Sequence, residues 1–392
     1  MMGLGVLAAA CGLGGFPGYD IVSTQVSRPH AALERVVYEV EVDDEPLNRF
    51  AVTHVRSRRG GRGDPVMLLS PFTLPGAFYE ISESGNYVES AAGRLAKDGF
   101  DVWLVDQRRT RLPPGSCETT TDCSVMADWD FDALSEDALF TLALLKAHHP
   151  RKKPVVGGFS AGSNAALATV NRAPHEFSGV FLYEGTFFTN DPDIAAHNDG
   201  TCATLEGAMA AGQVFDPSAA VPGLVLNLAA ADPGGLSPLP FPPGTTNREA
   251  MLLVFGSPPP PGALSPTSTF IRNLVDMGTQ SFIHTDEARL LQVGPLFDSY
   301  APLGALRDLA CGLAGHDDRH FDNVDEFRGD VLVFVEGTGF GPAMFDTAAL
   351  FEEADSIEID SNPELGEADP YFHRDWERVF YRPLKKWLKR TL

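Results

Sequence analysis

The segment Gly158-Phe159-Ser160-Ala161-Gly162 constrains the fold of this chain more than any other part of it. It follows the apolar run 154–157 and leads into residues 164–170, which have a helical composition. A serine between a strand and a helix, with glycines two residues to either side, predicts a nucleophile elbow. Glycine is required because the serine backbone is strained and side chains at the glycine positions would collide with a neighbouring strand or helix. An ordinary glycine and serine turn is the alternative.

Strand and helix patterns alternate around this motif. Such alternation predicts the α/β class, with a doubly wound and mostly parallel sheet. Near residue 186 the alternation stops, and it returns after residue 326. The residues between are rich in proline and glycine, and they predict a cap inserted over the mouth of the sheet. The expected segments are a signal or lipobox-like segment 1–11, a tether 12–30, a core in two parts 31–185 and 327–392, and the cap 186–326.

The net charge and the composition indicate which class of partner to exclude. The chain has 392 residues and a formal net charge of −23, which argues against a nucleic-acid partner because a phosphate-binding surface needs clustered Lys and Arg. We therefore expect no nucleic-acid partner. Its 44% hydrophobic and 21% charged residues are ordinary for a globular protein.

The extreme N-terminus predicts a location outside the cytoplasm. Residues 4–12 resemble the end of a bacterial lipoprotein signal, in which small residues precede a cysteine that is lipidated, here Cys11. A plain secretory peptide and a wrongly assigned start are the alternatives, since no Lys or Arg precedes the apolar run. The lipoprotein signal and the plain secretory peptide both predict a protein that is secreted or anchored in the bacterial cell envelope. In the lipoprotein case, a lipid on Cys11 would anchor the protein to the membrane.

The remaining cysteines agree with an oxidising compartment. Cys117 and Cys123 flank a short polar loop and predict a small disulfide. Cys202 and Cys311 are then expected to pair by exclusion. Four free thiols are the alternative.

The elbow, the strand order and a histidine near the C-terminus resemble the α/β-hydrolase family. The resemblance covers residues 34–185 and 327–392 and leaves the cap unmatched. It is closest to the capped lipase and esterase branch in the segments 100–104, 128–131 and 372–376. The resemblance implies an α/β-hydrolase fold with a large inserted cap and a catalytic triad.

The resemblance to that family assigns the catalytic roles of nucleophile, base and acid to particular residues of this chain. Ser160 would be the nucleophile and His373 its base, because a serine hydroxyl needs a base to attack an ester. The acid usually follows the strand 331–335, but Gly339 stands there and cannot hold an imidazolium. We expect Glu184 to take its place, with Glu336 as the alternative. The remaining candidates are Asp346 and Asp232.

An oxyanion hole needs two N–H groups aimed at the developing negative charge. The elbow supplies Ala161 N–H. The loop after Leu69 would supply the other from Phe72 or Thr73, since Pro71 has no N–H. This loop departs from the His-Gly that the family usually has.

These residues predict a serine hydrolase of carboxylic esters, of lipase or esterase type, acting on a small-molecule or lipid ester. An acyltransferase using the same triad is one alternative, and a non-catalytic ligand-binding protein is the other. No cofactor and no metal are expected, because His316 and His320 fit a polar cap loop and lack a third ligand.

Overall fold

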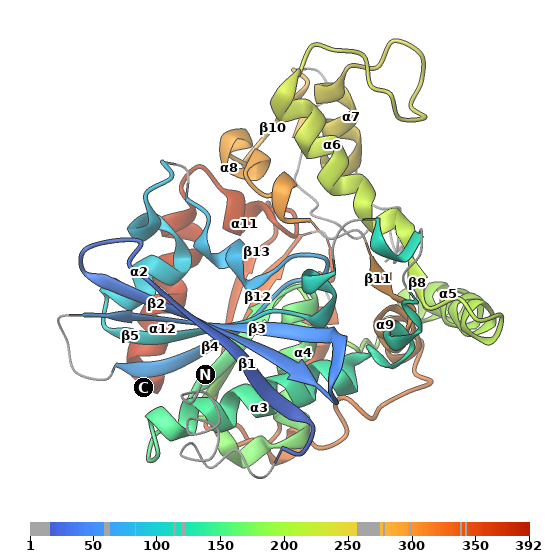
Figure 1. Ribbon diagram of the computed structural model, residues 1–392. Helices are drawn as coiled ribbons and strands as arrows, with labels where there is room; N and C mark the ends of the chain where they lie inside the picture. Colours follow the sequence, from blue (N-terminus) through green and yellow to red (C-terminus); the bar gives the residue numbers. More distant parts are fainter. Residues whose placement is uncertain are drawn as a thin grey trace.

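The computed structural model describes residues 16–58, 63–82, 84–112, 115–118, 122–256, 275–276, 279–297, 300–337, 339–341 and 343–392. A single large sheet forms its centre (Figure 1). The nine strands lie in the order β1-β2-β3-β5-β4-β6-β7-β12-β13. Their bounds are β1 Tyr19–Ser27, β2 Leu33–Val42, β3 Glu45–Ser57, β4 Asp64–Leu69, β5 Phe100–Val105, β6 Val155–Phe159, β7 Gly179–Tyr183, β12 Asp330–Glu336 and β13 Ser356–Asn362.

The predicted alternation and sheet are confirmed. Strands β5, β4, β6, β7, β12 and β13 run parallel, whereas β1, β2 and β3 form an antiparallel extension. The parallel strands β5, β6 and β7 are buried along their whole length, because helices cover both faces of this part of the sheet.

Successive residues of each parallel strand face opposite layers. Val331 and Val333 belong to one apolar cluster together with α3 and α4, whereas Leu332 and Phe334 belong to a second cluster together with α2 and α12. The two helix layers therefore bury both faces. The helices are α2 Ala91–Lys97, α3 Phe131–His148, α4 Ala161–Arg172, α10 Ala343–Ala349, α11 Asp369–Phe372 and α12 Arg382–Thr391, with a π-helical turn Glu377–Tyr381 before α12.

The N-terminal part differs from the expected tether. Within the segment 12–30, residues 19–27 form strand β1, which pairs antiparallel with β2. Most of its side chains are exposed, so it shows little of the apolar alternation that marks a strand in the sequence. Cys11 and the signal segment 1–11 lie outside the described residues.

Between β7 and β12 the chain leaves the sheet, where the sequence predicts the cap. Figure 1 shows α6, α7 and α8 standing together above the sheet, while α5 and α9 lie side by side at one flank. Residues 284–286 of this insertion pair with residues 372–374, at the end of α11 and just after it. The elements are α5 Pro192–Ala210, β8 Phe215–Asp216, α6 Ala220–Ala231, α7 Asn247–Gly256, β9 Val275–Asp276, β10 Ser281–Phe282, α8 Glu287–Leu291, β11 Ala301–Pro302 and α9 Leu303–Leu313.

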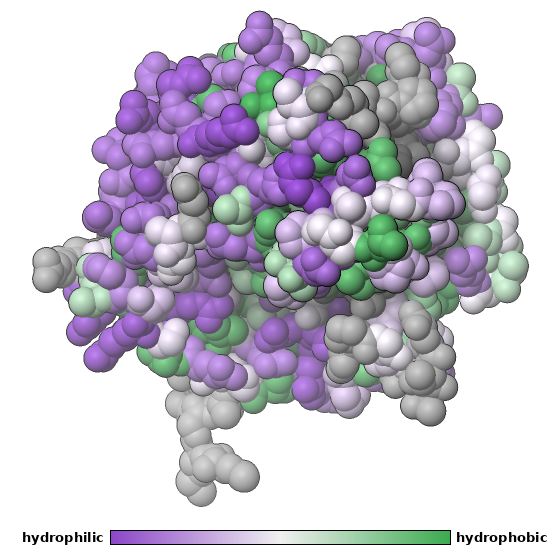
Figure 2. Space-filling model, turned by 90° about the horizontal axis from the view of Figure 1, so that it is seen from above, coloured by the Kyte–Doolittle hydropathy of each residue, from purple (hydrophilic) through white to green (hydrophobic). Residues whose placement is uncertain are grey.

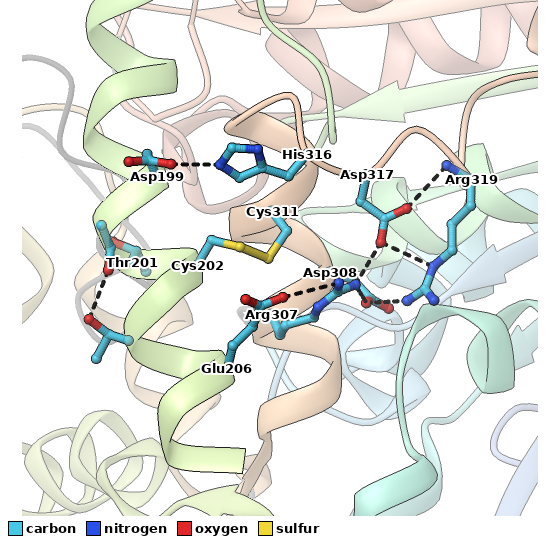
Figure 3. The surroundings of a disulfide bond; sticks show 12 residues. Asp199, Thr201, Cys202, Glu206, Arg307, Asp308, Cys311, His316, Asp317 and Arg319 are labelled. Carbon is cyan, nitrogen blue, oxygen red and sulfur yellow. Dashed lines mark hydrogen bonds and ion pairs between the residues drawn. A yellow bond between two sulfur atoms is a disulfide. The ribbon is translucent and has the colours of Figure 1, made fainter. Parts of the chain in front are cut away.

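Both predicted disulfides are present, Cys117–Cys123 and Cys202–Cys311. The second joins α5 to α9, two helices far apart in the sequence (Figure 3). Around it Arg307 contacts Glu206 and Asp317. This part of the insertion is therefore held by a covalent bond and by ion pairs.

Several large hydrophobic side chains of the insertion are exposed, among them Val221, Leu224, Leu236 and Ile283. Seen from above in Figure 2, hydrophobic residues gather among polar ones in the centre and right of the view, and the left side is mostly hydrophilic. Within the described residues, no helix is both long and apolar enough to span a membrane.

Candidate active site

Ser160 lies in a sharp turn between β6 and α4. Its backbone angles are φ 53° and ψ −124°, a conformation that costs a residue with a side chain about 1–3 kcal/mol. The N–H of Ser160 donates to Tyr183 O at 2.8 Å, and its carbonyl accepts from Ser163 N–H at 2.7 Å. These bonds hold the strained turn between β7 and the first turn of the helix, which is the geometry expected of a nucleophile elbow.

The glycines flanking Ser160 are sterically required. A Cβ atom at Gly162 would lie 2.2 Å from Leu69 O, and one at Gly158 would lie 2.6 Å from the same oxygen. A third glycine was not singled out in the sequence: a Cβ at Gly185 would lie 2.1 Å from Ser160 O. The backbones of β4, β7 and the elbow are therefore packed against one another without room for side chains.

A buried tyrosine links two neighbouring strands of the sheet next to the elbow by hydrogen bonds. Tyr79 Oη donates to Leu69 O at 2.8 Å and accepts from Phe159 N–H at 3.0 Å. It thus joins the ends of β4 and β6, the two strands that lead into the predicted oxyanion loop and the predicted nucleophile.

The predicted oxyanion donors lie on these two segments. Ala161 is the first residue of α4, so its N–H has no acceptor within the helix. The loop with Phe72 is fixed by Gln107, whose Nε2 donates to Ser70 O at 2.8 Å and to Pro71 O at 3.3 Å. The guanidinium of Arg109 lies over the Phe72 ring, 4.4 Å from its centre. The use of the Ala161 and Phe72 N–H groups as donors stays a prediction.

His373 follows α11 and is held by a local contact. Its Nδ1 accepts a hydrogen bond from Asp375 N–H at 2.9 Å. A neutral imidazole that accepts at Nδ1 carries its proton on Nε2, so Nε2 cannot take a proton from a serine in this state. The ring stacks on His284 with 5.6 Å between centres. Burial and the charge of His284 lower the pKa of His373.

The side chain of Glu184, the first predicted acid, is directed at the loop after β12 and not at His373. It is fully buried, and its carboxylate accepts Glu336 N–H at 2.9 Å and Phe340 N–H at 2.8 Å. Burial, and then the charge of Glu367, raise the pKa of Glu184 well above its ordinary value. In the structure Glu184 therefore shapes the loop after β12, where the acid is usually found, and makes no bond to His373.

The alternative acid Glu336 is also buried. Its side-chain oxygens have no hydrogen-bond partner among the described residues. Burial and the charge of Glu184 raise the pKa of Glu336 to about 10, so this group is neutral at neutral pH. Of the remaining candidates, Asp346 accepts from Asn190 N–H at 2.7 Å, and Asp232 accepts from Gly235 N–H at 3.1 Å.

The structure thus brings the predicted nucleophile, Ser160, next to the segments that carry the predicted oxyanion donors, but it does not bring His373 to a predicted acid. The other histidines discussed have their own partners. His316 bonds to Asp199 at 2.6 Å, and His320 bonds to Asp308 at 3.2 Å. Among the described residues, a single group of potential metal ligands is compact enough, namely Cys202, Glu206 and Cys311, and its two sulfurs are joined to each other.

Comparison with known proteins agrees with this architecture. No model of a protein family matches the sequence, and no curated protein does. Among solved structures, a proposed lipase from Sulfolobus solfataricus superposes with a TM-score of 0.66 at 20% identity, over 95% of this chain and all of that one. The chain has the α/β-hydrolase fold.

Other solved structures with this fold are less similar. A thermophilic esterase from Thermogutta terrifontis gives a TM-score of 0.44 at 16% identity, over 89% of this chain and 96% of that one. A monoacylglycerol lipase from Paleococcus ferrophilus gives 0.48 at 14%, over 88% and 99%. At such identities the likeness concerns the α/β-hydrolase fold alone.

The sequence reasoning missed Glu367, which the α/β-hydrolase fold places among the residues discussed above. It is buried and lies beside Gly339. One signal was available in the sequence, because Gly339 left the usual acid position empty and so pointed to a change in the residue that faces it.

Proposed function

We propose that this chain is a serine hydrolase that cleaves carboxylic esters through an acyl-enzyme on Ser160. The observation that carries the proposal is the strained conformation of Ser160, φ 53°, held between the backbones of β4, β7 and α4. Such strain persists only where the surroundings enforce it, and it is typical of functional positions. An ordinary turn has no need of three glycines packed against a strained serine.

In the proposed reaction Ser160 Oγ attacks the ester carbonyl carbon. The N–H groups of Ala161 and Phe72 stabilise the negative charge on the carbonyl oxygen. Collapse of the resulting tetrahedral intermediate releases the alcohol, and water then hydrolyses the acyl-enzyme and frees the acid from Ser160. His373 is the base that the sequence predicts for these proton transfers.

The insertion supports an apolar acyl group. Helix α6 exposes Val221 and Leu224, and Ile283 is exposed beside the residues that pair with 372–374. Lipase or long-chain esterase activity is therefore the subclass that we propose. The two disulfides support a location outside the cytoplasm. Lipid anchoring through Cys11 remains part of this proposal.

A fluorophosphonate probe tests the proposal, because it reacts only with an activated serine. We expect the folded wild-type protein to be labelled and Ser160→Ala to be unlabelled. Ser178→Ala, at the residue before β7, is the matched control and should label like the wild type. Absence of labelling in the folded wild type would overturn the proposal. If labelling succeeds, a series of esters of increasing chain length defines the substrate.

A non-catalytic ligand-binding protein is the second candidate. The observation that favours it is the Nδ1 contact of His373, which occupies the atom that a triad acid would bind. It predicts no labelling and no ester cleavage. An acyltransferase would be labelled, and product analysis with and without an alcohol acceptor separates it from a hydrolase.

A further inference from the structure

Three buried glutamates surround the strand ends next to Ser160. Phe159 of β6 pairs with Tyr183 of β7, which pairs with Phe334 of β12. Ser160, Glu184 and Glu336 therefore lie at neighbouring strand ends on one edge of the sheet. Glu367 enters from the loop after β13, and all three glutamates are at most 3% exposed.

Gly339 shows which side chain faces the usual acid position. A Cβ atom there would lie 2.6 Å from Glu184 Oε2 and 2.8 Å from Glu367 Cβ. The space that an acid at position 339 would fill is thus taken by the Glu184 carboxylate. The other residue that lines this space is Glu367, whose Cγ would lie 3.1 Å from the added Cβ atom.

The loop after β13 is fixed in this place by backbone contacts. Gly337 N–H donates to Leu365 O at 3.0 Å, which joins the loops after β12 and β13. Asp369 accepts from Gly366 N–H at 2.9 Å and from Thr285 Oγ1 at 2.6 Å. The loop therefore holds position 367 against position 339, whereas His373 lies beyond α11 and pairs with residue 285 of the insertion.

From this placement we infer that Glu367, and not His373, is the proton acceptor for Ser160 in the proposed hydrolysis. The inference rests on the proposed function of Ser160. Glu184 is then a positioning residue, because its carboxylate is held by two backbone N–H groups beside Glu367.

Every proton that moves in this step comes from and goes to a group already named, so no further reactant is needed. The Glu367 carboxylate takes the Ser160 hydroxyl proton while Oγ bonds to the carbonyl carbon and the carbonyl π electrons move to oxygen. When that oxygen re-forms the double bond, the ester C–O bond breaks and the leaving alcohol takes the proton from Glu367. Water repeats the sequence on the acyl-enzyme, giving its proton to Glu367 and returning it to Ser160 Oγ.

Probe labelling rates of matched variants test this assignment. Glu367→Gln keeps the shape of the side chain and removes the base, so we expect labelling to slow by about 100-fold or more. Glu364→Gln changes an exposed glutamate of the same loop and is the matched control, which should stay within about threefold of the wild type. His373→Gln is the competing test, and on this assignment it should still be labelled. Glu367→His should label, because an imidazole there lies beside the Glu184 carboxylate. Thermal unfolding of each variant checks that it is folded.

A rescue experiment separates catalysis from packing. Glu367→Ala should lose labelling and regain part of it in sodium formate, which a structural role would not produce. Wild-type labelling that Glu367→Gln leaves unchanged, or that His373→Gln abolishes, would overturn the assignment and leave the proposed function standing. A folded wild type that is unreactive, with only Glu367→His reacting, would overturn both.

Discussion

The side chains of Glu184 and Glu367 both lie beside Gly339, where a Cβ atom would be 2.6 Å from Glu184 Oε2 and 3.1 Å from Glu367 Cγ. Both glutamates are buried. Burial and the neighbouring charge raise the pKa of Glu184. In the proposed hydrolysis this arrangement supplies acid–base chemistry to Ser160 without a histidine.

The elbow glycines should be intolerant of any side chain. Gly162→Ala would place a Cβ atom 2.2 Å from Leu69 O, a contact that only backbone movement can relieve. We expect a loss of at least about 2 kcal/mol in the free energy of unfolding, measured by urea denaturation. Gly200→Ala is the matched control. That glycine is exposed inside α5 with no atom near its Cβ position, so alanine should stabilise by about 0.5–1 kcal/mol. Equal effects of the two changes would contradict the packing described.

The two disulfides should differ in their contribution to stability. Cys202–Cys311 closes a sequence separation of 109 residues and Cys117–Cys123 one of 6. Loop-closure entropy predicts a loss of about 5 kcal/mol for Cys202→Ala/Cys311→Ala and about 2 kcal/mol for Cys117→Ala/Cys123→Ala. Urea unfolding of both double variants measures this. A larger loss for the short loop would show that constraint of the unfolded chain is not the main effect.

Glu336 should make stability depend on pH. Its pKa is raised to about 10 from an ordinary value of 4.5, so the native state keeps a proton that the unfolded chain loses. Stability from this group is therefore lost as pH rises through that interval, by about 1 kcal/mol per pH unit. Glu336→Gln should match the wild type at pH 5 and exceed it at pH 8 in the free energy of unfolding. Exposed Glu352→Gln is the control and should leave the pH profile unchanged.

Much of the core was predictable from sequence. The buried strands and α3 have simple patterns, since parallel strands between two helix layers are apolar throughout. Residues 131–148 form the single helix α3, and most of its apolar side chains are buried. Strand β1 was not predicted from the sequence, because an exposed edge strand shows little apolar alternation.

The site was less predictable because it depends on contacts between distant loops. Ser160 sits in a local motif, and its strained turn follows from the residues around it. The neighbours of Gly339 come from β7 and from the loop after β13, and no spacing in the sequence shows that Glu367 reaches them. His373 was predicted from its place near the C-terminus, whereas its Nδ1 contact with Asp375 is visible only in the structure.

Mass spectrometry of the fluorophosphonate-treated protein tests the central claim most directly, because it identifies the modified residue. We expect one phosphonyl group per chain, carried by the peptide that contains Ser160, formed rapidly in the wild type and slowly in Glu367→Gln. An adduct on a different residue, or a folded wild-type protein without any adduct, would contradict it.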